Sequence, residues 1–573
     1  MAYSLGSRKG ILFILLLVLL PVSSIAQKKS NQGKEFYIVF GENQGGQLGQ
    51  DEDQNFFALF ITSKVATSGT VEVSGLGFTQ NFTTAPGEIT TIELPDGKRI
   101  GDPTVEVTFG NNQEEKALEG IAVHITSNDD IAVFGMNHKM YSSDAFMALP
   151  VEVLGIEYRV MCYQTSLPSS GITPGEFWIA AVKDSTNITI TPSALTRQGI
   201  TAGTQIKILL YKGDVYLVQG DPSDGLNDLT GSHIEADKPI AVFSGHVRTQ
   251  IPFNAVNANS GGQTSRDHLC EQLSPVNTWG DSVLVIPYKS DSLPDLVRIL
   301  SSNDGNVLSI NGATVKTLNA GEFYEIKSLQ GPISIHATSP ILVGQYLHTS
   351  KNGLSSPPTQ PYGDPAFSLV FSVEQFDTSY TFMLDQNPTF TGNFINIVAD
   401  PAGISTMILD GNPIMASPYS ASFLPIPGSN YVYAQISFTA SQQGAHTIHS
   451  AKPFGVTVYA MGPVDSYAFP GGASFYISPE AIVVQPSENH SFSIRPNPTS
   501  HSAMINFLLA DHSFTQVRIF NILGSEVAQV FSGELEAGDH SFSWDASDVP
   551  KGMYECVIRT GDQIHEMPMM VIR

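Results

Sequence analysis

The chain has 573 residues and a formal net charge of −25, because 54 aspartate and glutamate residues outnumber 29 lysine and arginine residues. This length is too great for one domain, and so acidic a chain excludes nucleic acid and anionic membranes as natural partners, since both attract basic surfaces. Three cysteines, an odd number, do not make a disulfide framework, although a bridge between Cys162 and Cys270 remains open.

The N-terminal segment has the pattern of a secretory signal peptide. Arg8 and Lys9 precede an apolar run from Ile11 to Leu20, and Ser24-Ile25-Ala26 provides small residues before a cleavage point. The apolar run is short for a bilayer span, and no later window comes closer. We therefore expect residues 1–26 to be removed after Ala26 and no membrane span in the mature protein.

A fourfold internal repeat fills the region between residues 33 and 477. Its clearest element is a pair of strands around a short turn, as in GIAVHITSNDDIAVFGMNH from Gly120 and GSHIEADKPIAVFSGH from Gly231. The equivalent residues of the four copies are Ile131, Ile240, Ile341 and Phe454. Three further landmarks precede each pair: an opening strand, a hairpin, and a glycine turn, the last at Pro86-Gly87, Ala202-Gly203, Ala320-Gly321 and Pro427-Gly428. Asn311-Gly312 and Asp410-Gly411 are strong two-residue hairpin turns, because both residues tolerate positive φ.

Each copy has room for six or seven short strands, the content of a β-sandwich. The predicted fold class is all-β: tandem β-sandwich-like repeats followed by a small Ig-like β-sandwich. The predicted repeat units are 33–153, 154–278, 279–375 and 376–477. Residues 478–490 are polar and contain two prolines, as a linker does.

Residues 33–477 resemble the N-terminal domain of IgG Fc-binding proteins, which also occurs alone in bacterial secreted proteins. The resemblance is strongest at Ser142-Ser143-Asp144-Ala145-Phe146 and at Glu271-Gln272-Leu273. It implies an extracellular recognition region. It does not imply that immunoglobulin is the ligand, because a shared fold does not carry ligand identity.

The last segment, 491–573, has the alternation and turns of a small all-β domain. It resembles the type A sorting domain of the type IX secretion system of Bacteroidetes-type bacteria, through Pro496-Asn497-Pro498, Asn521-Ile522-Leu523-Gly524 and Pro550-Lys551-Gly552-Met553-Tyr554. His565-Glu566-Met567-Pro568 departs from the family, which usually has lysines there. The resemblance implies export by that machinery to the medium or the outer cell surface. An ordinary C-terminal Ig-like domain is the alternative.

Histidine and aspartate recur after the repeated strand pair, at the edge of a long polar loop. The candidate ligand-binding residues are His138, Asp144, His246, Asp267, His348 and Asp364. The fourth copy has Met461 and Asp465 there. Such a couple can bind a ligand or orient a base. The alternative is structural: the aspartate caps the turn and the histidine fills a gap beside it.

Aromatic residues in or near the same loops, Phe253, Tyr362 and Tyr467, are candidates for stacking on sugars or peptides, or for anchoring the loops. The chain has no G-x-S-x-G, H-E-x-x-H, P-loop or paired C-x-x-C motif. We therefore expect no enzyme activity, no cofactor and no metal.

The sequence thus predicts a secreted or surface recognition protein that adheres to a glycoprotein, polysaccharide or matrix ligand through the loops of its repeats. A hydrolase that uses the His/Asp loops and a structural component of a surface coat or biofilm are the alternatives. Loops gathered on one surface favour binding. The sequence does not identify the ligand.

Overall fold

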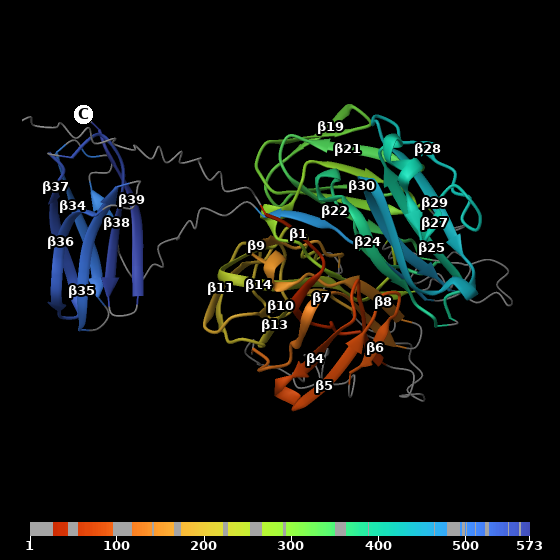
Figure 1. The fold of residues 1–573 in the computed structure, drawn as a ribbon, viewed down its shortest axis with the longest axis horizontal. Helices are drawn as coiled ribbons and strands as arrows, with labels where there is room; N and C mark the ends of the chain where they lie inside the picture. The colour runs from red at the N-terminus through yellow and green to blue at the C-terminus, as the bar shows by residue number, and fades with distance from the viewer. Residues whose placement is uncertain are drawn as a thin grey trace, which may run out of the picture. The chain divides into compact units, whose positions relative to one another are not determined.

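A computed structural model describes two compact parts of the chain, Met1–Pro479 and Glu480–Arg573 (Figure 1). The boundary between the two parts, at Pro479–Glu480, falls inside segment 478–490, which the sequence predicts to be a linker. The described residues are 27–43, 56–94, 117–139, 142–164, 173–221, 227–252, 266–289, 294–349, 363–387, 389–462 and 465–477, and in the tail 493–495, 499, 501–509, 512–521, 526–547, 549–560 and 563–572. Strands dominate them, which confirms the all-β prediction. Among these residues, no helix is long and apolar enough to cross a membrane.

The first two repeat units are each built from one seven-stranded sheet. Unit 1 consists of β2 (Gly33–Ile38), β3 (Phe56–Ser63), β4 (Thr67–Val73), β5 (Phe78–Thr84), β6 (Thr90–Glu93), β7 (Val123–Lys139) and β8 (Ser142–Met147). Unit 2 consists of β9 (Gly155–Arg159), β10 (Gly175–Ala181), β11 (Thr186–Thr191), β12 (Ile206–Leu210), β13 (Val215–Gln219), β14 (His233–Thr249) and β15 (Asp267–Gln272).

The last two units have the same plan with small changes. In unit 3 the long strand is interrupted, and the strands are β16 (Ser282–Val285), β17 (Leu296–Ser301), β18 (Asn306–Ile310), β19 (Ala313–Leu318), β20 (Phe323–Ile326), β21 (Ile333–Ala337), β22 (Ile341–Tyr346) and β23 (Phe367–Leu369). Unit 4 consists of β24 (Asp377–Leu384), β25 (Gly392–Ala399), β26 (Ile408–Leu409), β27 (Asn412–Pro413), β28 (Leu424–Pro425), β29 (Val432–Phe438), β30 (Gly444–Met461) and β31 (Ser466–Pro470).

Strand pairing is the same in all four units. A long strand (β7, β14, β21 with β22, or β30) lies in the middle, with the third and fourth strands on one side and the second and fifth on the other; in unit 4 the extra strand β29 lies between the second strand and β28. The opening and closing strands also pair with the long strand. The long strand changes partners halfway: β7 pairs with β4 up to Ser127 and with β3 from Ile131. The two halves of each unit are therefore the two layers of a sandwich-like repeat.

Equivalent positions in the four units have equivalent environments. Ile131, Ile240, Ile341 and Phe454 each begin the second half of the long strand and are 0, 0, 3 and 0% exposed. The turn glycines Gly87, Gly203, Gly321 and Gly428 all have positive φ, between 70° and 79°. Asn311-Gly312 and Asp410-Gly411 have positive φ at both residues, as predicted for their hairpins.

The four units form a closed ring around their closing strands. Strand β8 contacts β15 and β31, and β23 contacts the same two strands, so each closing strand has two neighbours around the axis. Short 3-10 turns end the first three units: η3 (Val151–Val153), η4 (Val276–Thr278) and η5 (Val373–Gln375). Three others, η2 (Ser74–Leu76), η6 (Pro401–Thr406) and η7 (Ala440–Gln442), lie within units 1 and 4.

The ends of the ring are joined by strand pairing instead of a covalent connection. Strand β1 (Gln27–Ser30) pairs antiparallel with β32 (Ser474–Ile477), and Gln27 is the partner of Ile477. Lys28 Nζ adds an ion pair of 3.0 Å with Asp377 Oδ1, and Lys29 Nζ one of 2.8 Å with Glu152 Oε2. The first described strand of the chain thus closes the seam between units 4 and 1.

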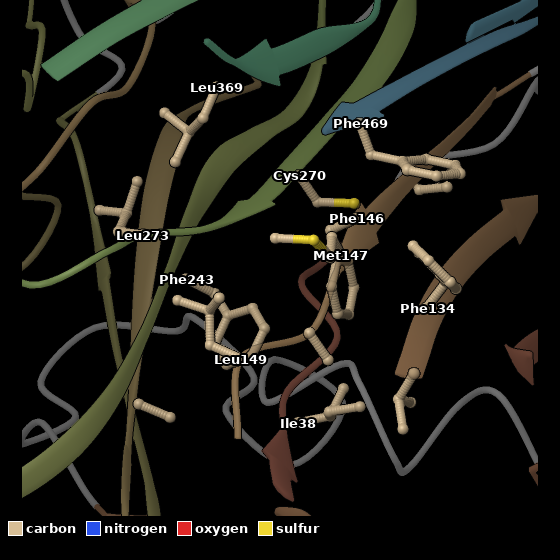
Figure 2. Packing of buried hydrophobic residues seen from close by; sticks show 14 of the residues in the cluster. Ile38, Phe134, Phe146, Met147, Leu149, Phe243, Cys270, Leu273, Leu369 and Phe469 are labelled. Carbon is tan, nitrogen blue, oxygen red and sulfur yellow. The ribbon is translucent and has the colours of Figure 1, made fainter. Parts of the chain in front are cut away.

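Apolar side chains from different units meet inside the ring. Figure 2 shows Phe146 and Phe134 of unit 1 near Phe243 of unit 2, Leu369 of unit 3 and Phe469 of unit 4. The ring centroids of Phe146 and Phe243 are 5.2 Å apart, and those of Phe134 and Phe469 are 5.0 Å apart. All four units therefore contribute to one apolar core, and unit 3 has in addition a core of its own around Val283, Val297 and Ile335. Cys162, Cys270 and Cys556 are all buried and free, so no Cys162–Cys270 bridge is formed.

The tail is a small two-sheet sandwich with its own core. One sheet is β33 (Ser493–Arg495), β34 (Ser502–Leu509) and β37 (Gly538–Asp545); the other is β36 (Glu526–Leu535), β35 (Ser513–Asn521), β38 (Gly552–Thr560) and β39 (Gln563–Val571). Trp544, Val517 and Ile519 are buried between the sheets, whereas Ser541 and Ser543 face outward, as the alternation predicted. This confirms the expected Ig-like sandwich.

Candidate functional site

The six polar residues singled out in the sequence all lie in the interior of the ring. His138, Asp144, His246, Asp267, His348 and Asp364 are 7, 0, 0, 0, 4 and 1% exposed. A side chain that contacts a macromolecular ligand directly has to be accessible. Burial of this degree favours the structural alternative for these side chains.

Asp144 lies on β8, on the axis of the ring, and its carboxylate is bound by backbone amides from all four units. Oδ1 accepts hydrogen bonds from Ala145 N at 2.9 Å and Ala468 N at 3.4 Å. Oδ2 accepts them from Cys270 N and Phe367 N, both at 3.1 Å. Burial raises the pKa of the Asp144 carboxyl well above its ordinary value, and these four amides act in the opposite direction.

The four donors occupy one register position. Cross-strand partners align Met147 with Phe134, Gln272 with Phe243, Leu369 with Gly344 and Pro470 with Thr457. The amide donors to Asp144 each lie two residues before the closing-strand residue of this alignment. They are Ala145, Cys270, Phe367 and Ala468. One carboxylate therefore satisfies the same backbone group in every unit, which a capped loop in a single unit does not explain.

The same register corrects the alignment of the aspartates. Three residues before the amide donors come Ser142, Asp267, Asp364 and Asp465. The sequence comparison had equated Asp144 with the other three, but Asp144 lies two residues further along its strand. The three register-equivalent aspartates make one level of the ring, and Asp144 belongs to a deeper level.

The upper level is also joined across units. Asp267 Oδ1 accepts hydrogen bonds from Ser143 N at 2.5 Å and His268 N at 2.9 Å, and Oδ2 accepts one from Ser466 N at 3.3 Å. Asp364 N donates to Ser466 Oγ at 2.8 Å. Unit 2 is thereby linked to units 1 and 4, and unit 3 to unit 4, at the bases of their loops.

The three histidines do not all occupy equivalent positions of the repeat. His138 and His348 follow Ile131 and Ile341 by seven residues, but His246 follows Ile240 by only six. Because successive strand residues face opposite sides, His246 does not occupy the same place. Burial lowers the pKa of His138 and His348 to about 4, and that of His246 to about 3.

His138 and His246 make contacts that stabilise the structure. His138 Nδ1 lies 2.5 Å from Ser143 Oγ, and His246 Nε2 lies 3.1 Å from the Gln164 carbonyl oxygen. Sequence reasoning missed His268, whose Nε2 lies 3.2 Å from Asn137 Nδ2 across the interface of units 1 and 2. The only sequence signal for it is its place beside Asp267, because the polar sequence of β15 does not predict that this strand is wholly buried.

The arrangement does not match a nucleophilic triad. Such a triad places the histidine between the nucleophile and the carboxylate. Here Ser143 lies between His138 and Asp465, whose carboxyl it also hydrogen-bonds, and Ser143 is fully buried. In the part of the chain that the structure describes, no group of three or more histidine, cysteine, aspartate or glutamate side chains can hold a metal ion.

The remaining candidate is the end of the ring at which these loop-flanking residues lie, which we call the loop end. It carries His138–Lys139, Ser142, Thr249–Pro252, Arg266–Asp267, Thr349, Gly363–Asp364, Gly462 and Asp465. Most of the residues that mark it are buried, and only Lys139, Pro252 and Arg266 are partly or fully exposed. Segments 44–55, 140–141, 165–172, 253–265, 350–362 and 463–464 lie outside the described residues, but the residues that flank them are fixed here.

Hydrogen bonds join these flanking residues. Lys139 Nζ donates to the Asn43 carbonyl at 2.6 Å, and His138 is the strand partner of Phe56. Ile251 N donates to Thr349 Oγ1 at 2.8 Å, and Thr349 N to the Ile251 carbonyl at 2.9 Å, which ties the loop of unit 2 to that of unit 3. The bases of loops from separate units therefore form one surface.

The aromatic candidates divide into two groups. Phe253 and Tyr362 lie outside the described residues. Tyr467 is fully buried, and its hydroxyl accepts a hydrogen bond from Asp385 N at 2.9 Å. Tyr467 is therefore a core residue, not a stacking platform, because its place on β31 turns it into the interior.

A buried arginine that sequence reasoning missed joins units 2 and 3. Arg298 on β17 donates from Nη1 to the Cys162 carbonyl at 2.7 Å and pairs with Asp228 Oδ2 at 2.8 Å. Its guanidinium lies 4.5 Å from the centroid of the Tyr163 ring. The unit interfaces thus contain fully satisfied charged groups as well as apolar packing.

Comparison with known proteins assigns both parts of the chain to families. The model of the family described as IgGFc binding protein matches residues 144–460, and that of the secretion system C-terminal sorting domain matches residues 493–573. A curated human protein named IgGFc-binding protein is 25% identical over 353 residues, which cover 61% of this chain and 6% of the human protein. The chain thus spans a small part of that relative.

Two solved structures align with the chain at low scores. Dimeric latent PorU from Porphyromonas gingivalis aligns with 58% of this chain and 31% of its own, at 10% identity and a TM-score of 0.13. Trypsin-activated alpha-2-macroglobulin from Escherichia coli aligns with 94% of this chain and 49% of its own, at 8% identity and a TM-score of 0.13. Scores this low carry no argument about fold or function.

Proposed function

Because the chain belongs to the IgGFc binding protein family, we propose that it is a recognition protein whose loop end binds an extracellular glycoprotein or polysaccharide. Its C-terminal sorting domain directs it through type IX secretion to the medium or the outer cell surface. The family supports a binding role and leaves the ligand open. We propose further that residues 1–26, which lie outside the described residues, serve as the signal peptide for the first membrane.

One observation carries the proposal: the long loops of separate units begin and end on the same end of a closed, shared-core ring. A rigid scaffold that gathers variable loops on one surface is a common way to build a binding site. The hydrogen bonds between Ile251 and Thr349, and between Asn43 and Lys139, fix the loop bases relative to one another. A preorganised surface loses less entropy on binding than independent loops do.

The alternatives have weaker support. A hydrolase that uses the His/Asp pairs needs accessible side chains, but those candidates are buried. A passive coat component does not need its loop bases joined across units. We therefore propose that the buried polar residues stabilise the loop end and that the loops contact the ligand.

The test is a screen of purified residues 27–479, which have a core separate from that of the tail, on arrays of glycans and of host and matrix glycoproteins, including the immunoglobulin Fc fragment. We expect saturable binding to one class of ligand. Binding should disappear when residues 254–264 and 352–361 are each replaced by a short Gly-Ser linker. Turnover of an ester, peptide or glycoside by the same preparation would replace this proposal by the hydrolase.

A further inference from the structure

We propose that Asp267, Asp364 and Asp465 share protons across three repeat units, and that this protonated cluster clamps the loop end of the ring. The clamp would regulate the surface assigned to binding above. That consequence rests on the proposed function, but the clamp itself does not depend on any ligand.

The first support is position. The three aspartates occupy one register position on the closing side of three different units. Asp267 and Asp364 lie two residues after the segments 253–265 and 350–362, and Asp465 ends the short connection between β30 and β31. Ser142 holds this position in unit 1, and its hydroxyl accepts a hydrogen bond from His268 N at 3.1 Å. The level therefore contains one acidic group from each of units 2, 3 and 4.

The second support is an unsatisfied atom. Asp267 has both oxygens hydrogen-bonded, to amides of units 1, 2 and 4. Asp465 is 2% exposed, and its Oδ1 is buried without a hydrogen-bond partner among the described residues. An ionised carboxylate in that position is costly. A proton on the cluster removes one charge and supplies an O–H donor to a neighbouring carboxylate, as in paired acidic groups generally.

The third support is the balance of charge around the cluster. The acidic groups that act on it are Asp144 on β8 and Asp385 after β24, and the basic groups are Arg248 on β14 and Arg266 before β15. His138, which reaches the cluster through Ser143, is neutral. Five carboxyl groups thus face two guanidinium groups in a buried region.

These surroundings set the direction of the effect. Burial, and then the charges of Asp465, Asp364 and Asp144, raise the pKa of Asp267 well above its ordinary value. Burial and the charge of Asp364 raise the pKa of Asp465 to about 8, against the hydrogen bond from Ser143 and the charge of Arg248. A folded-state pKa above the unfolded value near 3.8 means that stability is complete in acid and is lost as pH rises toward 8.

The clamp is tested on the mature full chain, residues 27–573, by hydrogen exchange of the segments that contain Ser143 and Ser466, whose amides both donate to Asp267. Their protection factors, corrected for the intrinsic rate, should fall at least about tenfold between pH 6 and pH 9. Asp465→Asn, which mimics the protonated acid, should abolish that fall. Asp130→Asn, at an exposed position of β7 in unit 1, should leave it unchanged.

A second readout uses the unaltered protein, in case Asp465→Asn does not fold. Infrared difference spectra should show a protonated carboxylic acid band that persists at pH 7. Absence of that band, or an equal pH dependence in wild type and Asp465→Asn, would overturn the clamp. Restoration of protection at pH 9 by added Ca²⁺ would also overturn it, because the cluster would then hold a cation. None of these outcomes depends on ligand binding, so failure of the clamp and failure of the proposed function are separable.

Discussion

The backbone amide of Phe367 donates a hydrogen bond of 3.1 Å to Oδ2 of Asp144, although the two residues are 223 positions apart in the chain. The same oxygen binds Cys270 N, and the other carboxylate oxygen binds Ala145 N and Ala468 N. A single side chain of unit 1 thus fixes the backbone of every unit at the axis. The ring, and with it the alignment of the loop bases, depends on this residue.

Replacing Asp144 should therefore destabilise the whole ring. Asp144→Ala leaves up to four buried amides without an acceptor. Each amide that no water satisfies costs about 1–3 kcal/mol, so we expect the free energy of unfolding to fall by at least about 3 kcal/mol. Asp144→Asn keeps one acceptor oxygen and should cost less. Urea unfolding of residues 27–479 measures both, with exposed Asp130→Ala as the control. An effect of Asp144→Ala no larger than that of the control would contradict this role.

The repeat makes a second stability prediction. Ile240 is fully buried at the point where β14 changes partners, so Ile240→Ala should cost about 2–5 kcal/mol. Leu209 on β12 is 47% exposed, and Leu209→Ala should cost less than about 0.5 kcal/mol. Thermal and urea unfolding compare the two. Equal effects would mean that the register assigned to the repeat is wrong.

The buried histidines predict a loss of stability in acid. Burial lowers the pKa of His246 to about 3, whereas the unfolded chain binds a proton on histidine below about 6.5. The contribution of His246 is therefore complete above pH 6.5 and is lost as pH falls toward 3. His246→Gln keeps a donor for the Gln164 carbonyl and an acceptor for Arg248 N.

The measurement is the difference in unfolding free energy between wild type and His246→Gln, followed from pH 7 to pH 4. Because the acidic cluster titrates identically in both proteins, the difference isolates the histidine. Wild type should lose stability more steeply than the variant over this range. Parallel curves would show that His246 has the same pKa in the folded and the unfolded protein, which would contradict this prediction.

The sorting tail predicts a defined export defect. Deletion of residues 491–573 should leave the protein in the periplasm, because the matched sorting domain begins at residue 493. Cell fractionation measures this, and a periplasmic reporter fused to residues 478–573 serves as the reciprocal control and should be exported. Normal secretion of the truncated chain would show that another signal suffices.

Local features of the fold were readable from the sequence because they depend on neighbouring residues. The alternation of Phe542 and Trp544 with serines predicted a half-buried strand, and Asn311-Gly312 predicted a turn with two positive φ values, which is observed at 50° and 80°. Self-similarity then predicted that the units share one plan. Each of these signals lies within a short window of the chain.

The ring and its centre were not readable, because their contacts are between residues far apart. Pairing of Gln27 with Ile477 leaves no periodic trace, and a buried aspartate looks like a loop aspartate in sequence. The residue of unit 2 that corresponds to His138 is Val247, and His246 is its neighbour. The register shift of β14 comes only after His246, between His246 and Thr249, and does not move this histidine. Only the strand partners distinguish Asp144 from Asp267.

The account depends most on the claim that loops of separate units form one binding surface at the loop end. The direct measurement is the affinity of residues 27–479 for the ligand found on the arrays, for wild type and for loop replacements 254–264 and 352–361 made singly. The control is Met415→Ser, at a residue of unit 4 that follows β27 and is 62% exposed. Each loop replacement should weaken binding at least about tenfold without lowering the unfolding temperature, and Met415→Ser should change neither. Full affinity in both loop replacements would contradict the account.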